Sequence, residues 1–65
     1  MPQVQITILE GRTTEQKRRV AERITQTLVE EIGTNLENIS IAFIEVPPAS
    51  YSLGGILMLD RKKSL

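Results

Sequence analysis

Apolar and polar residues alternate at the start of the chain. Within residues 3–9, every second residue is apolar and β-branched, at Val4, Ile6 and Ile8, and polar residues separate them. A period of two with β-branched side chains predicts a β-strand. Gly11 interrupts this pattern and marks the end of the strand.

A helical pattern follows from Thr13 to Ile32, a stretch that contains neither Gly nor Pro. Thr13 and Gln16 have the spacing of a capping box, which predicts the first turn of the helix. Gly33 stands where a helix C-terminus favours glycine. Apolar residues recur at every fourth position and predict one apolar stripe, made of Val20, Ile24, Leu28 and Ile32 with Ala21 beside them. Two ion pairs are predicted on the exposed side, Glu15 with Arg19 and Arg18 with Glu22.

A second strand is predicted for residues 39–46. Both faces of this strand are largely apolar, so we expect both to be covered; one carries Ile39, Ile41 and Phe43, and the other carries Ala42, Ile44 and Val46. Pro47 and Pro48 end the strand, since neither can donate a backbone hydrogen bond. The rest of the chain predicts a turn over residues 52–55, a short edge strand over residues 56–59 and a charged tail over residues 60–63.

The order strand, helix, strand predicts the fold class α/β (α+β). The helix is long enough to cross between two parallel strands, so we expect a β-α-β unit with a short C-terminal hairpin strand, in one domain over residues 1–65. One helix covers one face of a two-stranded sheet. The other face, with Ile44 and Val46, has nothing left in its own chain to pack on. The pattern therefore predicts a partner sheet, most simply from a second copy.

Composition points to the same conclusion. The chain has 65 residues and no Cys or His. A domain this small buries only ~60% of its unfolded surface alone, and it usually needs disulfides, a metal or oligomerisation. The missing residues exclude disulfides, cysteine nucleophiles and nearly all Zn, Cu or haem sites. Oligomerisation remains as the source of stability.

Charge and aromatic content exclude further classes. Eight basic and eight acidic residues cancel, whereas a nucleic-acid binder has a clear basic excess. One Tyr, one Phe and no Trp offer no stacking platform for single strands. No apolar run approaches the ~20 residues of a membrane span, and no signal pattern begins the chain. We expect a soluble cytoplasmic protein without nucleic-acid or membrane partners.

Pro2 and Arg12 are the residues that first suggest chemistry. Removal of Met1 would leave Pro2 with a free secondary amine, and α-amino groups ordinarily titrate at about 7.7–8.0. An apolar pocket or a nearby cation lowers such a pKa, which makes the amine a base near neutral pH. Arg12 can bind a carboxylate through two hydrogen bonds. At about 3.3 Å per residue the two lie roughly 30 Å apart, so a shared site must lie between subunits. Each also has a plainer interpretation, Pro2 as a strand start and Arg12 as a solvated loop charge.

Three segments resemble the 4-oxalocrotonate tautomerase (2-hydroxymuconate tautomerase) family. They are Pro2 with Ile6-Thr7-Ile8-Leu9-Glu10-Gly11-Arg12, then Glu15-Gln16-Lys17, and later Tyr51-Ser52-Leu53-Gly54-Gly55. The match runs over nearly the whole chain. The Leu-Glu-Gly-Arg run at this distance from a terminal proline is fairly specific, whereas the Gly-Gly element alone is weak.

The resemblance implies an isomerase that acts without a cofactor or metal. It implies enol–keto interconversion of 2-hydroxydienoates or 2-oxo acids from aromatic degradation, by β-α-β subunits paired into dimers that assemble as a homohexamer. Pro2 would be the base and then the acid, and Arg12 of a neighbouring subunit would hold a substrate carboxylate. Tyr51, where the family usually has phenylalanine, would form an apolar wall of the site with Leu9.

Ser40 departs from the family pattern. The family has a second arginine at the position of Ser40, and serine has no charge with which to clamp a carboxylate. This departure questions a dicarboxylate substrate and favours a monocarboxylate, a weaker enzyme or another reaction. Arg61, Lys62 or Lys63 of another subunit are candidates to replace the missing arginine, although a charged tail is more often solvated.

Two further functions stay open, the first because the resembled family also contains dehalogenases and hydratases. One is a dehalogenase or hydratase, or a partner subunit of a hetero-oligomer in which a second chain supplies the arginine. The resemblance implies that such members activate water with a carboxylate near the Gly-Gly segment. Here Ser52 and Leu53 stand there instead, and Glu45 is more simply a strand-end charge. The other is a non-catalytic oligomeric binding module, which retention of Met1 would favour because an acylated proline nitrogen is no longer a base.

Overall fold

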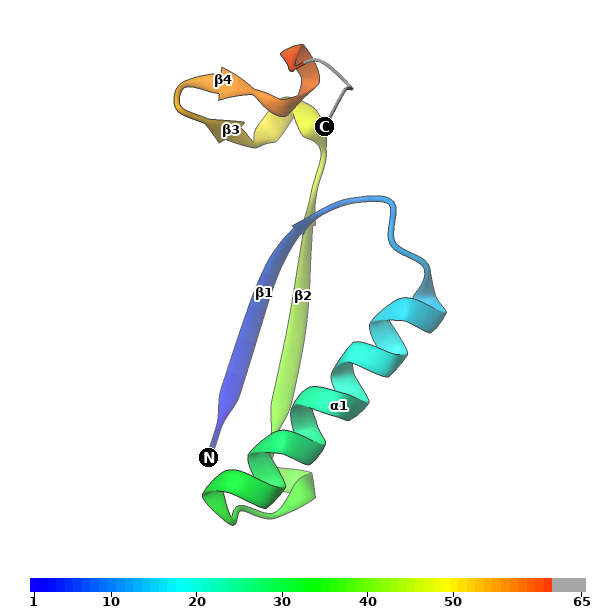
Figure 1. Ribbon diagram of the computed structural model, residues 1–65, viewed down its shortest axis with the longest axis vertical. Coiled ribbons are helices and arrows are strands. Elements are labelled where there is room, and N and C mark those ends of the chain that lie inside the picture. Colours follow the sequence, from blue (N-terminus) through cyan, green and yellow to red (C-terminus); the bar gives the residue numbers. More distant parts are fainter. Residues whose placement is uncertain (62–65) are drawn as a thin grey trace.

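The computed structural model describes residues 1–61 and has two strands beside one long helix (Figure 1). Gly11 and its neighbours connect the first strand to the helix, and a short 3₁₀ turn precedes the second strand. A small hairpin follows at the C-terminal end. The elements in chain order are β1 (Gln3–Leu9), α1 (Thr14–Ile32), β2 (Ser40–Val46), β3 (Ser52–Leu53) and β4 (Ile56–Leu57).

Strands β1 and β2 run parallel, as the crossover through α1 predicts. Gln3 lies opposite Ser40, and Leu9 lies opposite Val46. The pairing extends one residue beyond each end of β1. The Ser40 N–H donates to the Pro2 carbonyl at 3.2 Å, and the Glu10 N–H donates to the Val46 carbonyl at 2.9 Å. The register therefore places the first residues of both strands side by side, and likewise the last residues.

Helix α1 begins and ends where the sequence predicts. The Gln16 N–H donates to Thr13 Oγ1 at 3.0 Å, and the Thr13 N–H donates to Gln16 Oε1 at 2.9 Å, which completes the capping box. Gly33 ends the helix with a φ of 78°, a left-handed conformation that glycine adopts without steric cost. Its N–H donates to the Val29 carbonyl at 3.1 Å.

Of the two ion pairs predicted on α1, one is present in the structure. Arg19 Nε lies 3.6 Å from Glu15 Oε2, which confirms the first pair. The predicted Arg18–Glu22 pair is wrong, because Arg18 Nη1 instead lies 2.9 Å from Glu15 Oε1. Residues three apart on a helix are neighbours just as residues four apart are, so the Glu15 carboxylate takes both cations.

The apolar stripe of α1 is only partly covered. Ala21, Ile24 and Leu28 are half-buried, whereas Val20 and Ile32 are 41% and 64% exposed. Residues four apart advance by more than one turn of 3.6 residues, so the stripe drifts by about 40° per step. Ile32 lies at the far end of this drift, whereas Val20 still faces the sheet across an open cavity that Ile6 and Phe43 also line.

The two faces of the β1–β2 sheet differ as the alternation predicts. The face with Ile6 and Phe43 lies toward α1 and is half-buried, whereas Ile44 on the opposite face is 39% exposed. Across residues 1–61 no side chain is fully buried. The Cα radius of gyration is 15.1 Å, against about 11 Å for a compact domain of this length. The prediction of an uncovered sheet face is confirmed.

The C-terminal hairpin projects from the end of β2 and lies apart from α1 (Figure 1). Leu53 pairs with Ile56, so Gly54 and Gly55 alone form the loop. Both glycines have positive φ, 59° and 85°, as a two-residue hairpin turn requires. The predicted turn over residues 52–55 is thus too wide, because Ser52 and Leu53 belong to β3.

The predicted strand over residues 56–59 is real but shorter. Strand β4 covers Ile56–Leu57, and a 3₁₀ turn follows over Met58–Asp60. Of the predicted charged tail, Arg61 donates from Nη2 to the Leu53 carbonyl at 3.3 Å, and Lys62 and Lys63 lie outside the described residues. No helix within residues 1–61 combines the length and apolar character of a membrane span.

Candidate active site

The structure separates the predicted site residues into two groups. Pro2 and Ser40 lie where β1 and β2 begin, and Leu9, Arg12 and Tyr51 follow the opposite ends of the two strands. In Figure 1 the N-terminus lies far from both the β1–α1 connection and the hairpin. Seven strand residues at about 3.3 Å each separate the groups by more than roughly 20 Å. One copy of the chain therefore does not bring Pro2 and Arg12 together.

The cavity at the end of the sheet that carries Pro2 has a neutral lining. Pro2 is half-buried, and its carbonyl accepts the Ser40 N–H. Beside it a cavity of about 400 Å³ runs along the paired strands. Its lining contains amides, a hydroxyl and small apolar groups but no ionisable side chain: Gln3, Val4, Gln5, Ser40, Ile41 and Ala42.

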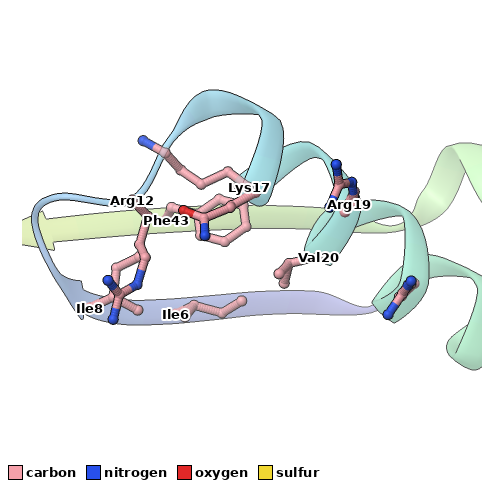
Figure 2. Close-up of a pocket in the computed structure, with 9 residues that line it drawn as sticks. Ile6, Ile8, Arg12, Lys17, Arg19, Val20 and Phe43 are labelled. Atoms are coloured by element: carbon pink, nitrogen blue, oxygen red, sulfur yellow. The ribbon is translucent and has the colours of Figure 1, made fainter.

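The opposite end of the sheet is rich in cations. Arg12 is exposed in the connection between β1 and α1. It lines a second cavity of about 410 Å³ between α1 and the sheet, and Figure 2 shows its side chain beside Ile8. Three more cationic side chains line this cavity, namely Lys17, Arg19 and Arg23. Its apolar lining comes from Ile6, Ile8, Val20 and Phe43. Anions with an apolar body suit such a surface.

An ion pair joins the start of α1 to the end of β2. Lys17 Nζ donates to Glu45 Oε2 at 2.9 Å, and the two side chains are only 26% and 35% exposed. The sequence interpretation of Glu45 as a strand-end charge missed this contact across 28 positions. A signal was available, because Glu45 has the parity of Ile41 and Phe43 and so lies on the face toward the helix. The pair holds the helix start, and with it the connection that carries Arg12, over the sheet.

Leu9 and Tyr51 lie on the Arg12 side of the molecule. Leu9 ends β1 opposite Val46 and is half-buried. Tyr51 stands between the 3₁₀ turn after Pro47 and β3, is 37% exposed, and accepts the Met58 N–H at 2.8 Å through its carbonyl. Within one copy neither side chain borders Pro2. If both form a wall around the amine, they must come from another copy.

A family model described as "Tautomerase enzyme" matches residues 2–61. The chain belongs to the tautomerase family. The family resemblance drawn from the sequence is thereby confirmed, and the match includes every residue of both ends of the sheet.

Known proteins of similar length support this membership. The chain is 39% identical over 56 residues to a 2-hydroxymuconate tautomerase of Comamonas testosteroni, covering 86% of this chain and 89% of that protein. It is 39% identical over 61 residues to a probable tautomerase of Bacillus cereus, covering 94% and 100%. A solved heterohexamer 4-oxalocrotonate tautomerase from Chloroflexus aurantiacus superposes with a TM-score of 0.88 at 34% identity, covering 95% and 100%. This tautomerase-family chain is therefore an enzyme of the isomerase class, and the predicted fold class is confirmed.

Proposed function

We propose that this tautomerase interconverts the enol and keto forms of a 2-hydroxydienoate or 2-oxo acid, with Pro2 as its acid–base group. The similarity to a 2-hydroxymuconate tautomerase over most of both chains supports the proposed substrate class. The family match begins at residue 2, where removal of Met1 would expose a secondary amine. Met1 is 95% exposed, so it makes little contact that its removal would cost.

The proposed reaction needs one group that accepts a proton and then returns it. The neutral Pro2 amine takes the proton of the C2 hydroxyl, and the C2–O bond becomes a carbonyl while the double bond shifts along the chain. The resulting ammonium then protonates a substrate carbon, which restores the amine. No residue need supply or remove electrons. An acylated nitrogen cannot take part, since its lone pair is delocalised into the peptide bond.

Arg12 of a second copy is proposed to hold the substrate carboxylate. Its guanidinium can donate two parallel hydrogen bonds to a carboxylate. Pro2 and Arg12 occupy opposite ends of β1, so a site that uses both must combine two copies. Leu9 and Tyr51 lie on the same side of the molecule as Arg12, and they are proposed to enter the site with it as an apolar wall.

Self-association is proposed on the strength of the uncovered apolar surface. Besides Ile44 on the open sheet face, the hairpin exposes Tyr51, Leu53, Ile56, Leu57 and Leu59 by 37–62%. The accessible surface is 5276 Å², whereas a folded monomer of this mass exposes about 4,200 Å². A homohexamer built as a trimer of dimers is the assembly we propose. A cytoplasmic location stays a prediction from the sequence, to be tested by cell fractionation.

The decisive experiment changes only the state of the Pro2 nitrogen. One sample has Met1 removed, as checked by mass, and the matched sample keeps an N-terminal extension that leaves Pro2 in a peptide bond. Ketonisation of 2-hydroxymuconate and of a monocarboxylate enol is followed by ultraviolet absorbance. We expect the extended protein to lose at least about 100-fold in kcat, within the 10²–10⁴ range of general acid–base catalysis. Pro2→Ala is expected to lose a similar factor. Equal rates in the two samples would end the assignment of Pro2.

A hetero-oligomer is the second candidate. The solved relative from Chloroflexus aurantiacus is a heterohexamer, and the lining of the cavity beside Pro2 contains no cation. In that case a second chain of similar length completes the site. Native mass spectrometry of this chain alone separates the candidates, because a homohexamer that turns over substrate by itself needs no second chain.

A further inference from the structure

We infer that the part of the site beside Pro2 accepts an uncharged substrate end, which makes this enzyme selective for 2-oxo acids and enols with a single carboxylate. The inference rests on the proposed function for the placing of Pro2 and Arg12. Arg12 binds the one carboxylate, and the surface around Ser40 meets the remainder of the substrate.

The backbone pairs Ser40 with the residue proposed as the base. Its N–H donates to the Pro2 carbonyl at 3.2 Å, and Gln3 lies opposite it in the register. Paired residues of neighbouring strands share a face, so the side chains of Gln3 and Ser40 lie on the same side of the sheet. Gln5 and Ala42 form the next pair along that face. All four side chains are exposed in the single copy and border the cavity.

This surface offers hydrogen bonds without charge. Two glutamine amides and one serine hydroxyl each supply both donors and acceptors, and Ala42 leaves room above the strand. Glu45 is the ionisable residue within β1 and β2, and Glu10 after β1 and Glu37 before β2 are the nearest ones outside them. All three are acidic, so the strands themselves provide no cation for a second carboxylate. A carboxylate desolvated there would lose hydration without gaining a charged partner, whereas a hydroxyl, carbonyl or methyl group would lose little.

The cations of the described residues lie away from this neutral surface. Four of them line the cavity on the helix side of the sheet, and Lys17 among them is paired with Glu45. Arg61 Nη2 donates to the Leu53 carbonyl in the hairpin. Arg12 is exposed in the connection between β1 and α1 and is the cation proposed to hold the substrate carboxylate, whereas the cavity next to Pro2 has a neutral lining. One cation and one neutral end match a monocarboxylate.

The test measures selectivity rather than rate alone. The wild-type enzyme and Ser40→Arg are compared on 2-hydroxypenta-2,4-dienoate, with one carboxylate, and on 2-hydroxymuconate, with two. We expect the wild type to favour the monocarboxylate in kcat/KM by about tenfold or more, as a missing charge-assisted hydrogen bond predicts. Ser40→Arg should reverse the preference, mainly through a lower KM for the dicarboxylate. Gln26→Arg adds the same charge on the exposed side of α1 and should leave the preference as in the wild type.

A binding experiment keeps the inference separate from the proposed reaction. Dissociation constants are measured by calorimetry for 2-oxohexanoate and 2-oxohexanedioate, which differ in the second carboxylate. Tighter binding of the monoacid by the wild type, with the opposite preference in Ser40→Arg, supports the inference even if neither enol is turned over. Absence of turnover would overturn only the proposed function. Equal or tighter wild-type binding of the diacid, or an unchanged ratio in Ser40→Arg, overturns the inference. If Ser40→Arg does not assemble, Gln3→Lys places a cation at the paired position and is judged by the same ratios.

Discussion

The two ends of the β1–β2 sheet differ in almost every property that matters for catalysis. At one end Pro2 pairs with Ser40 through its backbone, next to a cavity lined by neutral side chains. At the other end Arg12 and three further cations surround an apolar cavity under the start of α1. The first end offers a base without a charge to bind a carboxylate, and the second offers charge without a base.

The difference between the two ends indicates that one copy of this chain holds two incomplete sites. A strand of seven residues is too long for the proline and the arginine to meet, and too stiff to bend between them. If copies associate so that the neutral end of one meets the cationic end of another, each contact completes a site. The same association would cover the apolar hairpin that projects from the cationic end.

The largest effect is expected from breaking the association itself. Ile56→Asp places a charge on the hairpin, where Ile56 is 50% exposed in the single copy. If the hairpin packs on another copy, burial of an apolar side chain such as Ile56 stabilises the association by about 1.5–3 kcal/mol per subunit. Burial of an unpaired aspartate at the same place would destabilise the association instead. We expect native mass spectrometry to show smaller species and the activity to fall with the assembly. Asn35→Asp adds the same charge at an exposed site before the 3₁₀ turn and should change neither, whereas an intact oligomer of Ile56→Asp would contradict a hairpin interface.

A mixing experiment tests whether the two ends act together. Arg12→Ala removes charged hydrogen bonds worth about 1.5–3 kcal/mol, so KM should rise roughly 10–100-fold. When Arg12→Ala and Pro2→Ala chains are unfolded, mixed in equal amounts and refolded, random assembly pairs an intact Pro2 with an intact Arg12 at roughly a quarter of the sites. We expect about that fraction of wild-type activity to return. No recovery above the sum of the separate variants would show that each chain uses its own arginine.

The smallest effect is expected from the ion pair that holds the cationic end in place. Lys17→Gln and Glu45→Gln should each lower the free energy of unfolding by about 0.2–1 kcal/mol, because both side chains are partly exposed and solvent screens the pair. Urea denaturation of the two single variants and of the double variant measures the coupling. If the losses of unfolding free energy in the two single variants simply add up in the double variant, the contact contributes nothing to stability. A KM that rises while kcat is kept would show that the pair also positions Arg12.

Local signals predicted the elements well because each depends on neighbours in the chain. Thr13 and Gln16 cap the helix through contacts three residues apart, and Gly33 ends it through its own backbone freedom. The alternation of β1 predicted which side chains lie toward α1. The hairpin was harder to predict, because strands of two residues are too short to show a period, and Ser52 and Leu53 were mistaken for part of the turn.

The contacts between elements could not be predicted in the same way. Arg18 pairs with Glu15 rather than with the predicted Glu22, because the two helix spacings compete with almost equal energy. Lys17 reaches Glu45 across 28 positions, and only the docking of α1 on the sheet brings them within 2.9 Å. The two cavities likewise exist only where separate elements face each other.

The sequence by itself determined the family, the β-α-β order, the uncovered sheet face and the identity of Pro2, Arg12 and Ser40 as candidates. These follow from residue types and short-range spacing, which the chain carries whatever its surroundings. Only the tertiary structure decided that Ser40 hydrogen-bonds to the residue proposed as the base, and that the candidates divide into a neutral end and a cationic end. Strand register and helix docking depend on the summed packing of residues far apart in the chain, which no local pattern encodes.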